Sequence, residues 1–163
     1  MKSTILIAHN LRSTHNVGSL LRTAEGLGLD KVFLTGYTPY PALPNDPRLP
    51  HLKNKIDGQI HKTALGAESM IEIIVEPGIE AVLNELKAAG YSLVALEQQP
   101  DATKLKNYRR PHKVALIVGR EVEGIEPSVL KKCDEVIEIP MRGKKESFNV
   151  VQAAAMALYT LMV

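Results

Sequence analysis

Cysteine is almost missing from this chain, because its 163 residues include only Cys133. A single cysteine forms neither an intramolecular disulfide nor a cysteine metal cluster, so both are excluded within the chain. The five histidines lack metal-ligand spacing as well. We therefore expect a protein of a reducing compartment, the cytoplasm, that binds no metal.

Long hydrophobic runs are also scarce. Near the amino terminus the apolar run covers only residues 5–8, which is too short for the core of a signal peptide. Residues 148–163 are very apolar, but polar residues interrupt them and the segment is shorter than the roughly 20 residues that a membrane span needs. The sequence thus predicts neither secretion nor a membrane span, and it predicts a buried helix over residues 148–163.

The chain carries little net charge. Its 20 Lys and Arg residues and 18 Asp and Glu residues give +2, which neither demands nor excludes a nucleic-acid partner. With 45% hydrophobic and 23% charged residues, the composition is typical of one globular domain that buries a core. We expect residues 1–163 to form that single domain.

Cations nevertheless gather in two places. Residues 36–62 form a long segment, predicted as a loop, that is rich in proline and in Arg, Lys and His. It is either a surface loop stiffened by proline or a substrate-gripping loop whose cations face phosphate. Residues 104–113 form a second basic stretch, which we interpret as a solvated face.

Six apolar runs have strand character, and helical patterns separate most of them. Strands are expected at residues 5–8, 32–34, 71–75, 91–96, 114–118 and 136–139. Helices are expected at residues 16–28, 79–89, 127–132 and 148–163. Several runs lack alternation of apolar and polar residues, which indicates strands covered on both faces. The pattern predicts an α/β fold with a mainly parallel six-stranded sheet flanked by helices.

Known nucleotide and metal motifs are absent: no G-x-G-x-x-G follows a strand, and neither a Walker A sequence nor H-E-x-x-H occurs. Open parallel sheets bind ligands beyond the carboxyl ends of their strands, and three unusual loops lie at such positions. In the first, Gly18, Arg22 and Glu25 share a helix face opposite the apolar stripe. Asn16 and Gly18 favour close approach of a polar ligand there.

The other two loops are also suited to a ligand. Residues 119–125 place two glycines around acidic residues, and glycine permits a positive φ and close ligand approach. Residues 139–150 lead into the final helix with Ser147 and Asn149 as candidate caps. Capping accounts for only one of these two side chains.

Together, the three segments resemble motifs 1, 2 and 3 of the SpoU-like (TrmH-type) branch of the SPOUT superfamily of RNA 2′-O-ribose methyltransferases. The matching segments are Asn16-x-Gly18-x-x-x-Arg22-Thr23-Ala24, Gly119-x-Glu121-x-x-Gly124-Ile125 and Ile139-Pro140-Met141-x-Gly143-x-x-x-Ser147-Phe148-Asn149-Val150. Residues 62–68 are similar to a further segment of many members, so the likeness spans almost the whole chain. Phe148 departs from the pattern, since the family more often has leucine there.

The resemblance implies a parallel sheet whose carboxyl-terminal segment forms a deep trefoil knot, the SPOUT fold, with a site for S-adenosyl-L-methionine. It also implies a homodimer that binds RNA. The sequence supports the dimer independently, because apolar residues go almost completely around the predicted final helix, whereas a one-sided surface helix needs only a stripe. We expect residues 1–163 to carry no appended RNA-binding domain, which some members add.

Candidate site residues follow from the same resemblance and from the basic loops. The implied donor pocket is lined by Leu96, Glu97, Gly119, Ile139, Met141, Ser147 and Phe148. The implied catalytic residues are Arg22, Asn16, Glu121, Ser147 and Asn149. The candidate RNA-binding cations are Arg12, Arg48, Lys53, Lys55, Arg142, Lys144 and Lys145.

Arg22 would act on the acceptor ribose. A guanidinium has a pKa above about 12 and is a poor proton acceptor, so we favour a clamp on phosphate and ribose. Asn16 and Asn149 would orient Arg22 or the ribose, and Glu121 would hold Arg22 or its own loop. The predicted function is methylation of a ribose 2′-hydroxyl in tRNA or rRNA; the alternatives are a catalytically silent RNA-binding paralogue and an unrelated α/β nucleotide-binding protein.

Overall fold

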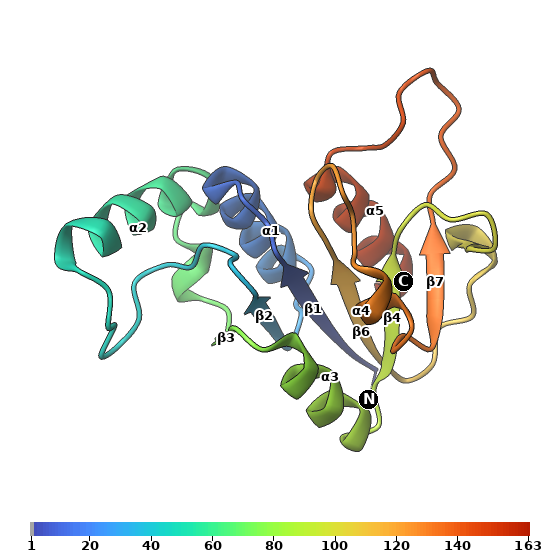
Figure 1. Ribbon diagram of the computed structural model, residues 1–163, viewed down its shortest axis with the longest axis horizontal. Coiled ribbons are helices and arrows are strands. Elements are labelled where there is room, and N and C mark those ends of the chain that lie inside the picture. Colours follow the sequence, from blue (N-terminus) through green and yellow to red (C-terminus); the bar gives the residue numbers. More distant parts are fainter. Residues whose placement is uncertain (1) are drawn as a thin grey trace.

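The computed structural model describes residues 2–163. Its centre is one parallel sheet in the strand order β3-β2-β1-β6-β4-β7-β5 (Figure 1). The strands are β1 (Ser3–His9), β2 (Lys31–Thr35), β3 (Ile73–Glu76), β4 (Ser92–Leu96), β5 (Thr103–Lys104), β6 (Lys113–Val118) and β7 (Glu135–Glu138). The helices are α1 (Thr14–Gly26), α2 (Pro50–Ala64), α3 (Ile79–Ala88), α4 (Pro127–Leu130) and α5 (Val150–Met162), with short 3-10 turns η1 (Ala67–Ser69) and η2 (Leu105–Asn107).

Helices cover both faces of the sheet. α1 and α5 pack on one face, and α3 and α4 pack on the other (Figure 1). Side chains of β1 alternate between the two layers: Leu6 and Ala8 join the core beneath α1 and α5, whereas Ile5 and Ile7 join the core beneath α3. All four are buried. This confirms the prediction of strands covered on both faces and explains why the run has no polar alternation.

The predicted α/β class and the six predicted strands are confirmed, but the sheet has seven strands where six were expected. The added strand, β5, is only two residues long and pairs in parallel with β7 at the sheet edge. Two residues are too few for a periodic pattern. Lys104 of β5 begins the stretch that was interpreted as a solvated basic face, and Leu105 within that stretch is buried.

The prediction of a loop over residues 36–62 is wrong in its second half, which forms α2. This helix begins with Pro50, a position where the missing N–H of proline costs little. Only Ile60 and Ala64 of α2 are buried, so its apolar stripe is too weak to be recognised by periodicity. Together with the loop before it, α2 projects from the body of the molecule (Figure 1); residues 37–64 are called the arm below.

α1 and α2 approach each other closely at Gly18. A Cβ at this glycine would lie 2.2 Å from Oγ1 of Thr63 and 2.3 Å from the carbonyl oxygen of Ile60. The expectation that a polar ligand approaches Gly18 is therefore wrong. This glycine is buried, and the backbone of α2 occupies the space beside it. Thr63 Oγ1 also donates to the carbonyl oxygen of His15 at 2.8 Å, which fixes α2 against the start of α1.

Two predicted helix ends have clear caps. Gly28, with φ +69°, follows α1 where a C-terminal cap was expected. α5 begins at Val150 rather than residue 148, because Asn149 is its N-cap and its Oδ1 accepts a hydrogen bond from the backbone N–H of Val151 at 2.8 Å. Ser147 therefore lies in the loop before α5. The trefoil knot of this carboxyl-terminal region stays a prediction.

Within residues 2–163, no helix combines the length and the apolar character that crossing a bilayer requires.

Candidate active site

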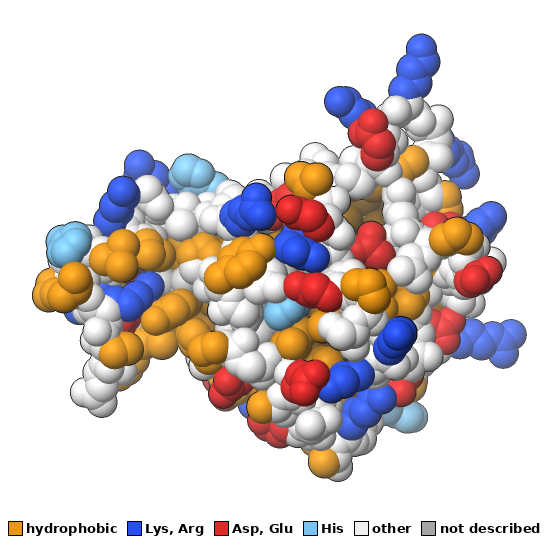
Figure 2. Space-filling model, in the orientation of Figure 1, with side chains coloured by type: hydrophobic (Ala, Val, Ile, Leu, Met, Phe, Trp, Pro, Cys, Tyr) orange, Lys and Arg blue, Asp and Glu red, His pale blue; other side chains and the backbone are white. Residues whose placement is uncertain are grey.

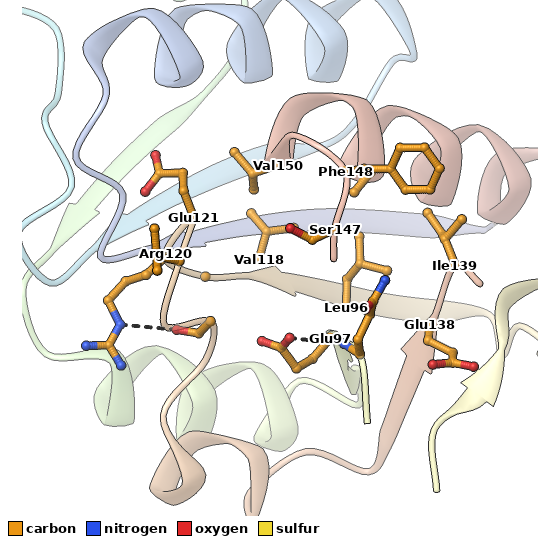
Figure 3. Close-up of a pocket in the computed structure, with 15 residues that line it drawn as sticks. Leu96, Glu97, Val118, Arg120, Glu121, Glu138, Ile139, Ser147, Phe148 and Val150 are labelled. Atoms are coloured by element: carbon orange, nitrogen blue, oxygen red, sulfur yellow. Dashed lines mark hydrogen bonds between the residues drawn. The ribbon is translucent and has the colours of Figure 1, made fainter. Parts of the chain in front are cut away.

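A pocket lies where the carboxyl ends of β4, β6 and β7 meet the loop before α5 (Figure 3). This is the edge at which open parallel sheets bind ligands. Six of the seven residues predicted for a donor pocket line it, namely Leu96, Glu97, Gly119, Ile139, Ser147 and Phe148. The seventh, Met141, is half-buried two residues beyond Ile139 and is not among the lining residues.

Apolar side chains form much of the pocket wall. Leu96, Ile139 and Phe148 surround the cavity in Figure 3, and Val118 and Val150 stand beside them. The two valines were not predicted. Each lies at the boundary of its element, since Val118 ends β6 and Val150 begins α5, so a search of strand and helix ends finds them.

The charged groups of the lining are mostly acidic. Glu97, Glu121 and Glu138 contribute three carboxylates, and Arg120 contributes the one guanidinium among the described lining residues. Arg120 donates from Nε to the carbonyl oxygen of Gly124 at 3.1 Å (Figure 3). This excess of negative charge favours a ligand that carries a positive charge over one that carries phosphates.

The loop 119–125 folds onto Glu97. The backbone N–H of Ile125 donates to Oε2 of Glu97 at 2.9 Å. A Cβ on Gly124, whose φ is +70°, would lie 2.1 Å from the same oxygen, and a Cβ on Gly119 would lie 2.6 Å from Cγ1 of Ile125. Both glycines are thus required by the packing of the loop itself, which holds the wall of the pocket in place.

Three of the predicted catalytic residues form a chain of hydrogen bonds beside the pocket. Asn16 donates from Nδ2 to Oε1 of Glu121 at 3.2 Å. Asn149 donates from Nδ2 to Oδ1 of Asn16 at 3.4 Å. The chain joins the start of α1, the loop after β6 and the cap of α5, and Ser147 stands two residues before Asn149 in the pocket wall.

Arg22 lies outside this chain. It is exposed on α1 and off the buried stripe of Val17, Leu21 and Ala24, as predicted. Within residues 2–163 its guanidinium makes no ion pair and no side-chain hydrogen bond, so the predicted contact with Asn16 or Glu121 is not formed within one copy of the chain.

A second polar cluster, not predicted from the sequence, joins the loop after β1 to the end of the loop after β6. Asn10 donates from Nδ2 to Oε1 of Glu126 at 2.7 Å, and His9 places Nε2 3.2 Å from Oε2 of that carboxylate. Asn10 has φ 56°, and its Oδ1 accepts from the backbone N–H of Tyr37 at 3.1 Å. His9 also pairs through Nδ1 with Oγ1 of Thr35 at 2.8 Å. The cluster thus ties the loop after β1 to the arm and to α4.

Burial and charge act on the pKa values of this cluster in opposite ways. Burial lowers the pKa of His9, and this outweighs the attraction of Glu126, which raises it. Burial alone would raise the pKa of Glu126, but hydrogen bonds from the backbone and from Asn10, with the nearby His9 and Arg120, bring the pKa below its ordinary value. A neutral histidine and an ionised carboxylate are therefore favoured together near neutral pH.

The predicted RNA-binding cations differ in their surroundings. Arg142, Lys144 and Lys145 are exposed in the loop before α5, and cations stand out at its tip in Figure 2. Arg12 is exposed and pairs with Glu123 at 3.4 Å. In the arm, Lys55 is exposed and Lys53 is half-exposed.

Arg48 is occupied within the arm. Its guanidinium pairs with Asp46 at 2.5 Å and donates to the carbonyl oxygens of Tyr40 and Pro41 at 2.9 and 3.0 Å. It also stacks 3.7 Å from the centre of the Tyr40 ring. These contacts give Arg48 a structural role, which its position in a basic stretch did not indicate. Because its guanidinium is occupied within the arm, we no longer propose Arg48 as an RNA contact.

No group of three or more acidic, histidine or cysteine side chains in residues 2–163 is arranged to hold a metal ion.

Known proteins are similar to this chain in sequence and in fold. A Staphylococcus aureus (strain MSSA476) protein assigned to the TrmH family of tRNA/rRNA methyltransferases is 30% identical over 158 residues, which are 96% of this chain and 57% of that protein. The AdoMet-bound rRNA methyltransferase from Sinorhizobium meliloti has a TM-score of 0.83 and 21% identity, covering 99% of this chain and 56% of that one. A solved RNA 2′-O ribose methyltransferase has a TM-score of 0.80 and 25% identity, with coverage of 99% and 56%.

This chain spans little more than half the length of these three relatives. The SpoU rRNA Methylase family aligns with residues 3–159, and this range includes all three motif segments and the pocket they line. The resemblance predicted from those motifs is thereby confirmed. The chain belongs to the SpoU rRNA Methylase family.

Proposed function

We propose that this protein is an S-adenosyl-L-methionine-dependent methyltransferase that methylates a ribose 2′-hydroxyl in tRNA or rRNA. The observation that carries the proposal is the hydrogen-bonded chain of Asn16, Glu121 and Asn149 at the edge of the strand-end pocket. Family membership and the similarity to a solved RNA 2′-O ribose methyltransferase support it.

The pocket suits S-adenosyl-L-methionine in its chemistry. Apolar walls at Leu96, Ile139 and Phe148 match an adenine ring, and the carboxylates of Glu97 and Glu138 match a ligand that carries positive charge. When bound, this donor supplies an electrophilic methyl group on a sulfonium. The side chain of Glu97 is itself held by the backbone of Ile125, so this carboxylate is positioned by the loop 119–125.

Polar groups beside the pocket would hold the acceptor ribose. The amides of Asn16 and Asn149 offer both donors and acceptors, and the carboxylate of Glu121 fixes the amide of Asn16. Arg22, exposed on the same helix as Asn16, would clamp phosphate and ribose as a planar cation. Positioning of this kind supplies much of the acceleration in a transfer between two bound groups, and the hydroxyl proton would leave to water or an RNA phosphate.

We further propose a homodimer formed through α5. The outer face of this helix and the loop before it expose four large apolar side chains, Phe148, Met156, Tyr159 and Val163. An exposed apolar stripe of this kind marks a surface that another protein covers. A second copy of the chain would also bring its own cations to a long RNA.

The test is incubation of the purified protein with tritiated S-adenosyl-L-methionine and either bulk tRNA or ribosomal RNA. Radioactivity in the RNA, recovered after digestion as 2′-O-methylated nucleosides by mass spectrometry, is the expected result. Label only on a base, or tight binding of NAD in place of S-adenosylhomocysteine by calorimetry, would contradict the proposal. Asn16→Ala/Glu121→Ala, which removes the chain beside the pocket, is expected to bind donor and transfer no methyl group.

A further inference from the structure

Gly58 has no structural reason to be glycine within this chain. It lies in the middle of α2, it is exposed, and a Cβ there would meet no atom within 4 Å. Glycine in an exposed helix interior destabilises the helix relative to alanine. The chain therefore carries a destabilising residue at a position where neither a turn nor a neighbouring element of the described structure requires glycine.

Cations flank this glycine on the same face of the helix. His51, Lys55, Gly58 and Lys62 follow one another at intervals of four, three and four residues, so they share one side of α2. All four are exposed. In the part of the chain that the structure describes, neither lysine forms an ion pair. These four residues are called the basic face of α2.

The basic face leads to the candidate active site. Thr63, next to Lys62, donates to the carbonyl oxygen of His15, and His15 precedes Asn16. From Lys62 back to His51 the face extends for about 16 Å, since an α-helix rises about 1.5 Å per residue. Figure 2 shows Lys, Arg and His side chains gathered along the arm. The end of α2 that carries Lys62 therefore lies next to the start of α1, where the hydrogen-bonded chain begins at Asn16.

The arm that carries this face is held in shape by its own contacts. Arg48 joins Asp46 to the carbonyl oxygens of Tyr40 and Pro41. Oδ1 of Asp57, on α2, accepts from the backbone N–H of Ala42 at 2.7 Å. Arg48 thus holds the loop together, Asp57 ties the loop to α2, and little ordering is left to be done when a ligand binds.

We propose that the basic face of α2 binds the sugar-phosphate backbone of the RNA substrate, and that glycine at position 58 leaves room for that backbone to approach the helix. This inference rests on the proposed function for the identity of the polyanion. A backbone contact requires cations and space. A protein interface would require an aromatic or aliphatic anchor. The four residues of the basic face include none, and the exposed Leu49 and Leu52 lie outside that face.

The experiment compares Gly58→Ala and Gly58→Gln with Gly26→Ala and Gly26→Gln. Gly26 is a matched control, because it is also exposed in a helix and a Cβ there also meets no atom within 4 Å. Binding of fluorescently labelled bulk tRNA to the full chain is followed by anisotropy at several salt concentrations. Melting temperatures of all variants are measured by circular dichroism.

Alanine at position 58 is expected to raise the melting temperature and to weaken tRNA binding about fivefold, with a larger loss for glutamine. Both Gly26 variants are expected to keep the wild-type affinity. The double variant Lys55→Ala/Lys62→Ala is expected to reduce the slope of log affinity against log salt by about one to two, because fewer counterions are released.

Gly58 variants with unchanged affinity for tRNA would overturn the inference, and so would a lysine double variant with an unchanged salt slope. The proposed function fails in a different way: wild-type protein would then bind tRNA through the basic face but transfer no methyl group to any RNA. If the wild-type protein methylates RNA but the Gly58 variants keep the wild-type affinity for tRNA, only the inference about α2 is refuted.

Discussion

Asn10 and Glu126 are joined by a 2.7 Å hydrogen bond across 116 residues of sequence. This bond connects the loop that leads to Asn16 with the end of the loop that carries Glu121. Because Asn16 and Glu121 are themselves bonded, two parallel links hold the two loops together. The geometry around Asn16 and Glu121 therefore depends on Asn10, which is not among the residues that line the pocket.

Replacing Asn10 with alanine should loosen that geometry. The change removes the bonds to Glu126 and to the backbone N–H of Tyr37, and it places alanine at φ 56°, where asparagine is better tolerated. We expect a loss of about 2–3 kcal/mol of unfolding free energy and slower methyl transfer. Asn45→Ala is the control, since Asn45 also has φ 56° but is exposed in the arm; equal effects of the two changes would show that backbone strain alone matters.

Acid should destabilise the fold through His9. The pKa of His9 is lowered by burial from an ordinary 6.5, so the unfolded chain takes up this proton more readily than the folded chain. Stability from the neutral histidine is full above pH 6.5 and falls as pH drops through 6.5 toward the lower folded pKa. Glu126, whose pKa is lowered from 4.5, loses its contribution only below that value.

The check is a series of thermal melts between pH 7 and pH 5. Wild-type protein should lose melting temperature over this range, and His9→Gln should show a flatter profile. His51→Gln, a change at an exposed histidine of the arm, should keep the wild-type slope. A steep slope retained in His9→Gln would assign the pH dependence to another group.

Gly124→Ala should damage the donor pocket. The new methyl group would lie 2.1 Å from Oε2 of Glu97, at a residue with φ +70°, so the loop 119–125 must move. We expect a stability loss of about 1–3 kcal/mol and at least tenfold weaker binding of S-adenosylhomocysteine in calorimetry. Gly143→Ala, where the Cβ meets nothing within 4 Å, should bind normally; normal binding by Gly124→Ala as well would exclude the loop from the donor site.

Arg22→Ala should abolish methyl transfer and leave donor binding and the melting temperature near normal, because the residue is exposed and off the buried stripe. Lysine keeps the charge but loses the planar fork of guanidinium, so Arg22→Lys should also be severely impaired. Single-turnover transfer to tRNA measures both. A fully active Arg22→Lys protein would refute the clamp.

Two substitutions on α5 should separate core from interface. Ala157 is fully buried within one chain, so Ala157→Glu should cost about 3–5 kcal/mol and give insoluble protein. Tyr159 is 62% exposed, and Tyr159→Glu should give folded monomers with little methyl transfer. Sedimentation and circular dichroism distinguish these states; a dimeric and active Tyr159→Glu protein would place the dimer surface elsewhere.

More of the pocket than of the arm could be predicted from the sequence, because the pocket residues belong to local sequence patterns. Residues such as Gly119, Ile139 and Ser147 lie at strand ends or helix starts, and their local patterns are visible in the sequence. The bond between Asn10 and Glu126 has no such pattern, because its partners are far apart in the sequence and meet only in the folded sheet.

Side-chain partners limit sequence reasoning in a similar way. Arg48 stands among cations in the sequence, yet Asp46 and two carbonyl groups occupy it. Gly18 stands in a ligand-like motif, yet the backbone of α2 fills the space beside it. α2 itself was missed because it begins with Pro50 after a proline-rich loop and because only its Ile60 and Ala64 are buried. In each case the deciding contact is tertiary.

β1 is an interior strand of the sheet, and this affects how the chain folds. β1 pairs on one side with β2 and on the other with β6, so Ser3 lies opposite Lys113. Contacts between residues this far apart slow folding, since a long loop must close before they form. During synthesis, β1 cannot pair with β6 until residue 118 has left the ribosome. Before that, one edge of β1 is unpaired and can bind chaperones or form incorrect contacts.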